Sequence, residues 1–143
     1  MKIAPLAVVL GGCIALSAGS CNSTHRKPDA TVAAFAPVKE VLETNCVHCH
    51  GENHFPEMPA VTSTRDLARL VGPANWIVPG HPEKSRFYVV AMMPDTAWGA
   101  MPPTGHAISG KEAKVLRQWI LAGAKVPAAN LPLKPRGELP RSR

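Results

Sequence analysis

The residues with the clearest capacity for chemistry are two cysteines and a histidine near the middle of the chain. Cys46, Cys49 and His50 form the pattern Cys-x-x-Cys-His. Two thiols at this spacing can each add to one vinyl group of the same porphyrin, and the histidine that follows can bind the iron as an axial ligand. The same residue types also bind zinc. The motif therefore indicates one covalently bound haem c, and a zinc-stabilised interaction domain is the alternative.

A haem held by His50 has a second axial position, whose occupant decides between electron transfer and ligand chemistry. Met101 precedes Pro102 and Pro103, which fix an extended segment that can present a thioether with little loss of entropy. We therefore expect Met101 to be the distal ligand. Met58 follows His50 by only eight residues, so we expect it to lie on the proximal side. The remaining candidates are Met92, Met93, His25, His48, His54, His81 and His106.

The N-terminus has the organisation of an export signal. Lys2 is followed by an uncharged apolar stretch from Ile3 to Ala18, which is too short for a convincing membrane span. Small residues then precede Cys21, in a sequence that resembles a degenerate lipobox; Cys13 is a rival cleavage position. We expect residues 1–20 to be a lipoprotein-type signal peptide and Cys21 to carry the lipid anchor, with an unlipidated exported protein as the alternative.

The four cysteines can all be assigned on this basis. Cys13 falls in the signal peptide, Cys21 is the expected anchor, and Cys46 and Cys49 belong to the haem motif. No cysteine is left for a structural disulfide. The expected location is the periplasm or the outer face of a bacterial membrane.

The charge is unevenly distributed along the 143 residues. The whole chain has a net charge of +6 and a pI of about 9.5. Residues 30–127 hold nine basic and eight acidic side chains, so their net charge is only +1. The excess of basic residues lies in the tails, where solvated flexible segments are the simplest interpretation. Together with export, this distribution argues against a nucleic-acid partner.

The hydrophobic periodicity between the tails is helical and predicts an all-α domain at residues 33–126. Residues 21–32 are polar and are expected to form a tether, and the Pro- and Arg-rich residues 127–143 are expected to be a disordered tail. An apolar face with Phe35 predicts a first helix that runs into the cysteine motif. Ser109 and Glu112 form a capping box for a last helix with Trp119 on its apolar face. We expect these two helices to pack together.

The order of four motifs resembles the class I c-type cytochromes and is more narrowly similar to the planctomycete-type cytochrome c domain. The motifs are Cys46 to Gly51, Ile77 to Ser85, Met101-Pro102-Pro103, and Ile108-Ser109 leading to Trp119 through Ala124. The resemblance covers roughly residues 33–126. It implies a small cytochrome c fold, with N- and C-terminal helices packed around one haem. It also implies thioether bonds at Cys46 and Cys49, His50 as the proximal iron ligand and Met101 as the distal one.

The leading functional hypothesis is a non-enzymatic, monomeric one-electron carrier with His/Met ligation. Its expected partners are redox proteins: a donor dehydrogenase, and an acceptor oxidase or another cytochrome. It would contact the membrane through its lipid anchor. The alternative is a haem-based sensor of small ligands or a peroxidase-like protein, in which Met101 leaves the iron.

Overall fold

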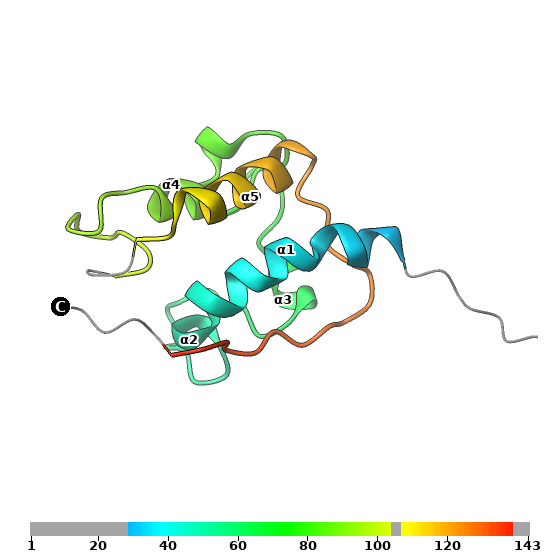
Figure 1. Cartoon of the computed structure of the whole chain (residues 1–143), viewed down its shortest axis with the longest axis horizontal. Helices are drawn as coiled ribbons and strands as arrows, with labels where there is room; N and C mark the ends of the chain where they lie inside the picture. The colour runs from blue at the N-terminus through cyan, green and yellow to red at the C-terminus, as the bar shows by residue number, and fades with distance from the viewer. Residues whose placement is uncertain (1–28, 104–106, 139–143) are drawn as a thin grey trace, which may run out of the picture.

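The structure is a computed structural model that describes residues 29–103 and 107–138. Within these two ranges every regular element is a helix (Figure 1), which confirms the all-α class. The elements are α1 (Ala30–Asn45), α2 (Val47–His50), α3 (Thr64–Arg69), the 3-10 helix η1 (Pro82–Lys84), α4 (Arg86–Ala91) and α5 (Gly110–Leu121). No helix in the described part of the chain is both long enough and apolar enough to span a membrane. The expected signal peptide (1–20), most of the tether, Cys21, His25 and His106 lie outside the described residues.

Helix α1 begins earlier than the sequence predicted. The Asp29 carboxylate accepts the N–H of Thr31 at 2.9 Å and caps the helix, which therefore begins at Ala30, inside the expected tether. Its buried residues are Phe35, Val38, Val41, Leu42 and Glu43, so the apolar face is the predicted one with one carboxylate added.

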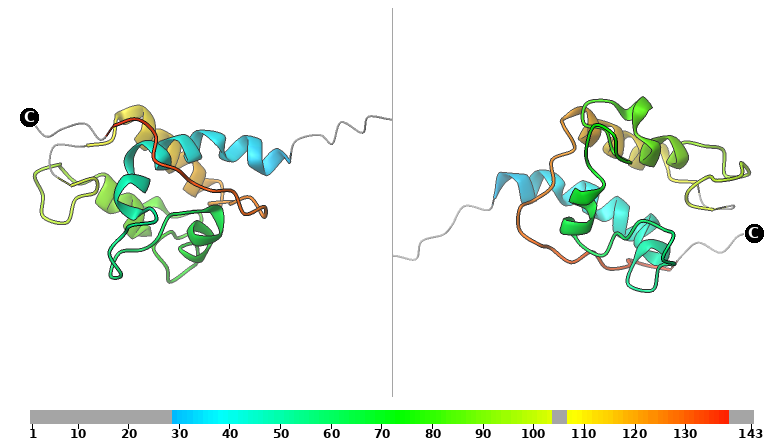
Figure 2. Two further views of the ribbon diagram at one scale, coloured as in Figure 1. Left: turned by 90° about the horizontal axis from the view of Figure 1, so that it is seen from below. Right: turned by 180° about the vertical axis from the view of Figure 1, so that it is seen from behind.

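Helix α5 has the expected cap and the expected apolar face. The Ser109 hydroxyl and the Glu112 carboxylate form the capping box, and Leu116, Trp119 and Ile120 are buried. The rings of Phe35 and Trp119 meet edge to face with their centroids 6.2 Å apart, and α1 and α5 lie side by side (Figures 1 and 2). The predicted packing of the first and last helices is confirmed.

The chain after α5 turns back across the molecule. Gly123 has φ +94°, a conformation that favours glycine, and the N–H of Ala124 then donates to Trp119 O at 2.9 Å. The following segment runs along α3 and the end of α1 toward α2 (Figure 2). We call residues 129–136 the C-terminal strap.

The prediction that the whole tail from residue 127 is disordered is wrong for residues 127–138. Leu133 is 4% exposed and belongs to the core, and residues 63 and 132 form an isolated antiparallel bridge. Residues 139–143 lie outside the described ranges. A Pro-rich segment has few backbone N–H donors, but this one still forms hydrogen bonds with neighbouring residues. Burial of Leu133 offsets the conformational entropy that the segment loses on ordering.

Replacement of Leu133 by alanine tests this correction. Because the side chain is buried, Leu133→Ala is expected to lower the free energy of unfolding by about 2–5 kcal/mol. Leu121→Ala is the matched control, since Leu121 is 46% exposed and its truncation should cost less than about 0.5 kcal/mol. Chemical denaturation measures both. Equal costs for the two variants would mean that Leu133 does not lie in the core in solution.

Candidate functional site

An apolar cavity of about 510 Å³ lies between the end of α1 and α2 on one side and α4 with the loop after it on the other. These groups of elements are separated in Figure 1, with α4 and α5 above α2. The lower wall includes Val41, Asn45, Cys46, Cys49, His50, Met58 and Val61, and the upper wall includes Phe87, Val90, Met101, Pro102 and Leu116. Its size and apolar walls suit a small-molecule or cofactor site.

The predicted attachment motif forms one compact turn at the cavity wall. The N–H of Cys46 donates to Leu42 O at 2.8 Å, and the N–H of His50 donates to Cys46 O at 2.9 Å, so α2 continues almost directly from α1. The next residue is Gly51, and only glycine fits at this position because a Cβ would lie 2.4 Å from Val47 O. Cys46, Cys49 and His50 line the same cavity.

The imidazole of His50 has one nitrogen engaged by the protein. Its Nδ1 lies 2.8 Å from Pro59 O, and a carbonyl can only accept, so Nδ1 carries the proton. The backbone of His50 is held by the same neighbouring segment, since the N–H of Val61 donates to His50 O at 2.7 Å. This tautomer leaves Nε2 with its lone pair for a metal, the usual arrangement of a metal-binding histidine.

Neither thiol of the motif is in a disulfide, since Cys46 and Cys49 are both free. Burial, together with the nearby Glu112 carboxylate and Cys49, raises the pKa of the Cys46 thiol to about 12. Within residues 29–103 and 107–138, no three side chains of Cys, His, Asp or Glu gather as a metal-binding group.

Met101 reaches the cavity from the opposite wall. Its N–H donates to Val90 O at 3.0 Å, which ties the segment before Pro102 to α4. Pro102 is buried and Met101 is 38% exposed, so the thioether lies at the cavity edge. The structure thus brings Met101 to the same cavity as His50.

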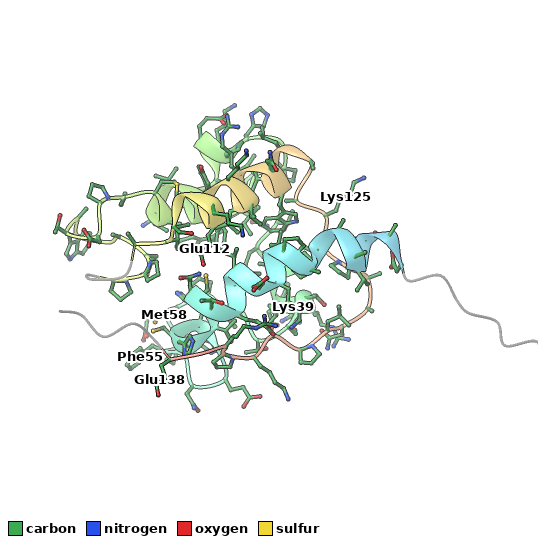
Figure 3. All side chains as sticks on the ribbon, viewed as in Figure 1. Lys39, Phe55, Met58, Glu112, Lys125 and Glu138 are labelled. Carbon is green, nitrogen blue, oxygen red and sulfur yellow. The ribbon has the colours of Figure 1, made fainter. Side chains whose placement is uncertain are left out.

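The other candidate ligands divide into one that reaches the cavity and several that do not. Met58 also lines it, on the loop that leaves α2 (Figure 3). This loop also carries Pro59, whose carbonyl accepts the hydrogen bond from His50. The remaining described candidates are not among the residues lining the cavity: Met92, Met93, His48, His54 and His81.

Three contacts around the site involve residues that the sequence analysis did not single out as site residues. Pro59 contributes only a backbone carbonyl, which no residue pattern reveals. Asn45 Nδ2 donates to Glu112 Oε1 at 2.8 Å and so joins the end of α1 to the start of α5, where Figure 3 shows Glu112 between the two helices. Glu43, on α1, is a buried carboxylate that holds the C-terminal strap.

Glu43 gives the molecule a predictable response to acid. Burial alone would raise its pKa, but the Lys134 N–H, the Lys39 ammonium and the Arg136 guanidinium together hold the pKa below its ordinary value of 4.5. A lowered folded-state pKa contributes stability above about pH 4.5, which is lost as the pH falls through the folded-state pKa.

Glu43→Gln is therefore expected to lower the free energy of unfolding at pH 7 by about 1–3 kcal/mol and to weaken its dependence on pH in this acid range. Glu40→Gln is the control, because the Glu40 side chain is 66% exposed and pairs with the same Arg136 at 3.5 Å. Denaturation at pH 7 and at several values below pH 4.5 checks both variants. A wild-type-like pH profile for Glu43→Gln would contradict this role.

Comparison of the chain with family models, with curated proteins and with solved structures finds no match.

Proposed function

We propose that this chain is a monohaem c-type cytochrome that carries single electrons and has the small cytochrome c fold. The observation that supports this proposal is that the possible haem-binding groups of the chain meet at one cavity. Two free thiols, an imidazole with an available Nε2 and a thioether line one apolar cavity, and they come from two separate parts of the chain. This set fits a haem c and gives each donor a role.

The size of the cavity is consistent with a large apolar cofactor. The cavity has a volume of about 510 Å³ and mostly apolar walls, and a bound porphyrin would bury those walls. Binding would then stabilise the fold.

The residues have distinct roles in this proposal. Cys46 and Cys49 would hold the haem covalently, and His50 and Met101 would bind its iron. The haem iron supplies one-electron exchange between its ferric and ferrous states. Pro59 keeps the proton on Nδ1 of His50, and the thioether of Met101 favours the reduced state. One-electron exchange transfers no proton, so no general acid or base is required, and we propose no enzymatic activity.

The cellular setting is part of the same proposal. The chain would be exported, anchored to the outer face of a bacterial membrane or within the periplasm by a lipid on Cys21, and monomeric. It would exchange electrons with a donor dehydrogenase and with an oxidase or another cytochrome. A nucleic-acid partner is not part of this proposal.

An absorption spectrum of the protein, expressed with a haem-attachment system, is the first test. Reduction is expected to give the sharp bands of a low-spin c-type haem, and the mass of the denatured chain should include one haem. Purified protein that contains stoichiometric zinc and no haem would refute the proposal and favour the interaction domain.

The second candidate is a small-ligand sensor or peroxidase-like protein, in which Met101 would leave the iron. Carbon monoxide binding to the reduced protein at neutral pH, without a methionine-to-iron band in the oxidised spectrum, would distinguish this function from electron transfer.

A further inference from the structure

We propose that the C-terminal strap, residues 129–136, positions His50 and thereby sets its strength as an iron ligand. This inference rests on the proposed haem function, because it concerns the proximal ligand of that site. The strap is far from His50 in sequence and does not line the cavity. It acts through two sets of contacts, one on each side of the histidine.

The first set fixes the segment that follows the cavity loop. The N–H of Leu133 donates to Thr62 O at 2.9 Å, and the N–H of Thr64 donates to Leu131 O at 2.9 Å. The Thr64 hydroxyl donates to Ala129 O at 2.7 Å and accepts the N–H of Leu131 at 2.9 Å. Thr64 is 1% exposed, so these bonds are shielded from water. Four hydrogen bonds therefore hold residues 62–64 against the strap.

The same segment holds His50 through the residues just before Thr62. Pro59 O accepts the Nδ1–H of His50, and the N–H of Val61 donates to His50 O. Val61 is buried in the core. Side chain and backbone of the histidine are thus both bound to a segment that the strap immobilises.

The second set of contacts holds the other end of the strap to α1 and α2. The N–H of Lys134 donates to the buried Glu43 carboxylate at 2.9 Å, and the N–H of Arg136 donates to Glu43 O at 2.9 Å. Arg136 O lies 3.2 Å from His48 Nε2, which donates to it. His48, inside the haem motif, thus points to the strap and not into the cavity. The turn that carries His50 is restrained from both sides.

The chemical consequence concerns the Nδ1–H···O bond of His50. A short bond to a fixed carbonyl increases the basicity of the imidazole and stabilises ferric iron, and partners of this kind affect metal sites strongly. A loose strap would allow Pro59 to move and would weaken this bond. The reduction potential would then become more positive, which a purely structural role of the strap would not produce.

The test compares two variants that each remove one buried hydroxyl. Thr64→Val keeps the side-chain shape and removes two of the strap bonds. Ser85→Ala is the matched control: Ser85 is fully buried, and its hydroxyl bonds to Val78 and His81, neither of which belongs to the strap. Measurements are the hydrogen exchange of the Val61 amide and the His50 Nδ1 proton, the reduction potential, and the unfolding midpoint.

Thr64→Val is expected to speed exchange at both positions by about tenfold, the change that loss of hydrogen bonds of ordinary strength gives, and to make the potential more positive. Ser85→Ala should lower the unfolding midpoint by about as much as Thr64→Val does. It should leave both exchange rates and the reduction potential as in the wild type. Equal exchange rates and potentials in the two variants would overturn the inference. The exchange rate of the Val61 amide reports on the backbone of His50 and can be measured without haem. If the protein lacks haem, the proposed function is refuted, and the Val61 exchange rate still tests whether the strap positions His50.

Discussion

In the proposed haem protein, replacement of Met101 by alanine is expected to leave the haem covalently bound and to lower its reduction potential on the order of 0.1 V. The reason is that axial ligands move haem potentials over roughly 0.8 V, and loss of the thioether removes the ligand that favours ferrous iron. The iron would gain an open position, so the reduced variant should bind carbon monoxide. Spectro-electrochemical titration measures the potential and detects the change of ligand in the same experiment.

Two other methionines provide the controls. Met92 is also 38% exposed and lies at the end of α4, but it is not among the residues that line the cavity, so Met92→Ala should leave the potential unchanged. Met58→Ala tests the alternative, because Met58 does line the cavity. A potential that falls in Met58→Ala and not in Met101→Ala would assign the distal position to Met58.

Loss of both motif cysteines is expected to abolish covalent attachment. The double variant Cys46→Ala/Cys49→Ala should retain no haem after acid and organic extraction, and each single variant should retain part of it through the remaining thioether. Without its cofactor the apolar cavity stays hydrated, so the double variant should also unfold at a lower denaturant concentration. Mass spectrometry of the denatured chain measures the attachment, and circular dichroism follows the unfolding.

Cys21→Ser is the control for this experiment. It removes a cysteine outside the motif, so haem attachment should persist while any lipid on the protein is lost. The same variant therefore also tests the proposed anchor. Haem that remains covalently bound after both Cys46 and Cys49 have been replaced would show that the motif is not the attachment site.

The packing of the first and last helices was predictable because it depends on local pattern. The apolar spacing around Phe35 and Trp119 identifies one face on each helix, and Ser109 with Glu112 marks the start of α5. Each signal lies within a few residues of the element that it defines. The boundary at Ala30 was missed because Asp29 was grouped with a polar tether, although its carboxylate caps α1.

The C-terminal strap could not be predicted in the same way. Its composition, with Pro132 and Pro135 beside a single buried leucine, is also that of a disordered tail. What orders it is a set of partners at least 65 residues earlier in the chain, including Thr64 and Glu43. A local pattern contains no information on such partners. The role of the Pro59 carbonyl could not be predicted for another reason. Every residue has a backbone carbonyl, and only the fold determines which one accepts the Nδ1–H of His50.

The four candidate ligands could be selected from the sequence, whereas their surroundings could not. Cys46, Cys49, His50 and Met101 were selected by residue type and spacing, and the structure brings all four to one cavity. The bond between Asn45 and Glu112 joins the end of α1 to the start of α5 through residues of ordinary helical composition, so only the fold reveals it.

The contrast between near and distant contacts has a consequence for the order of folding. The turn at Cys46 to His50 closes over four residues, whereas the Asn45–Glu112 and Glu43–Lys134 bonds span 67 and 91 residues. Contacts of long sequence separation form slowly because they require large loops to close. We expect pulse-labelling during refolding to show the Cys46 amide protected before that of Lys134. A newly made chain would then present both thiols on a formed turn while the cavity walls are still apart, which leaves time for a bulky cofactor to be joined before the protein closes around it.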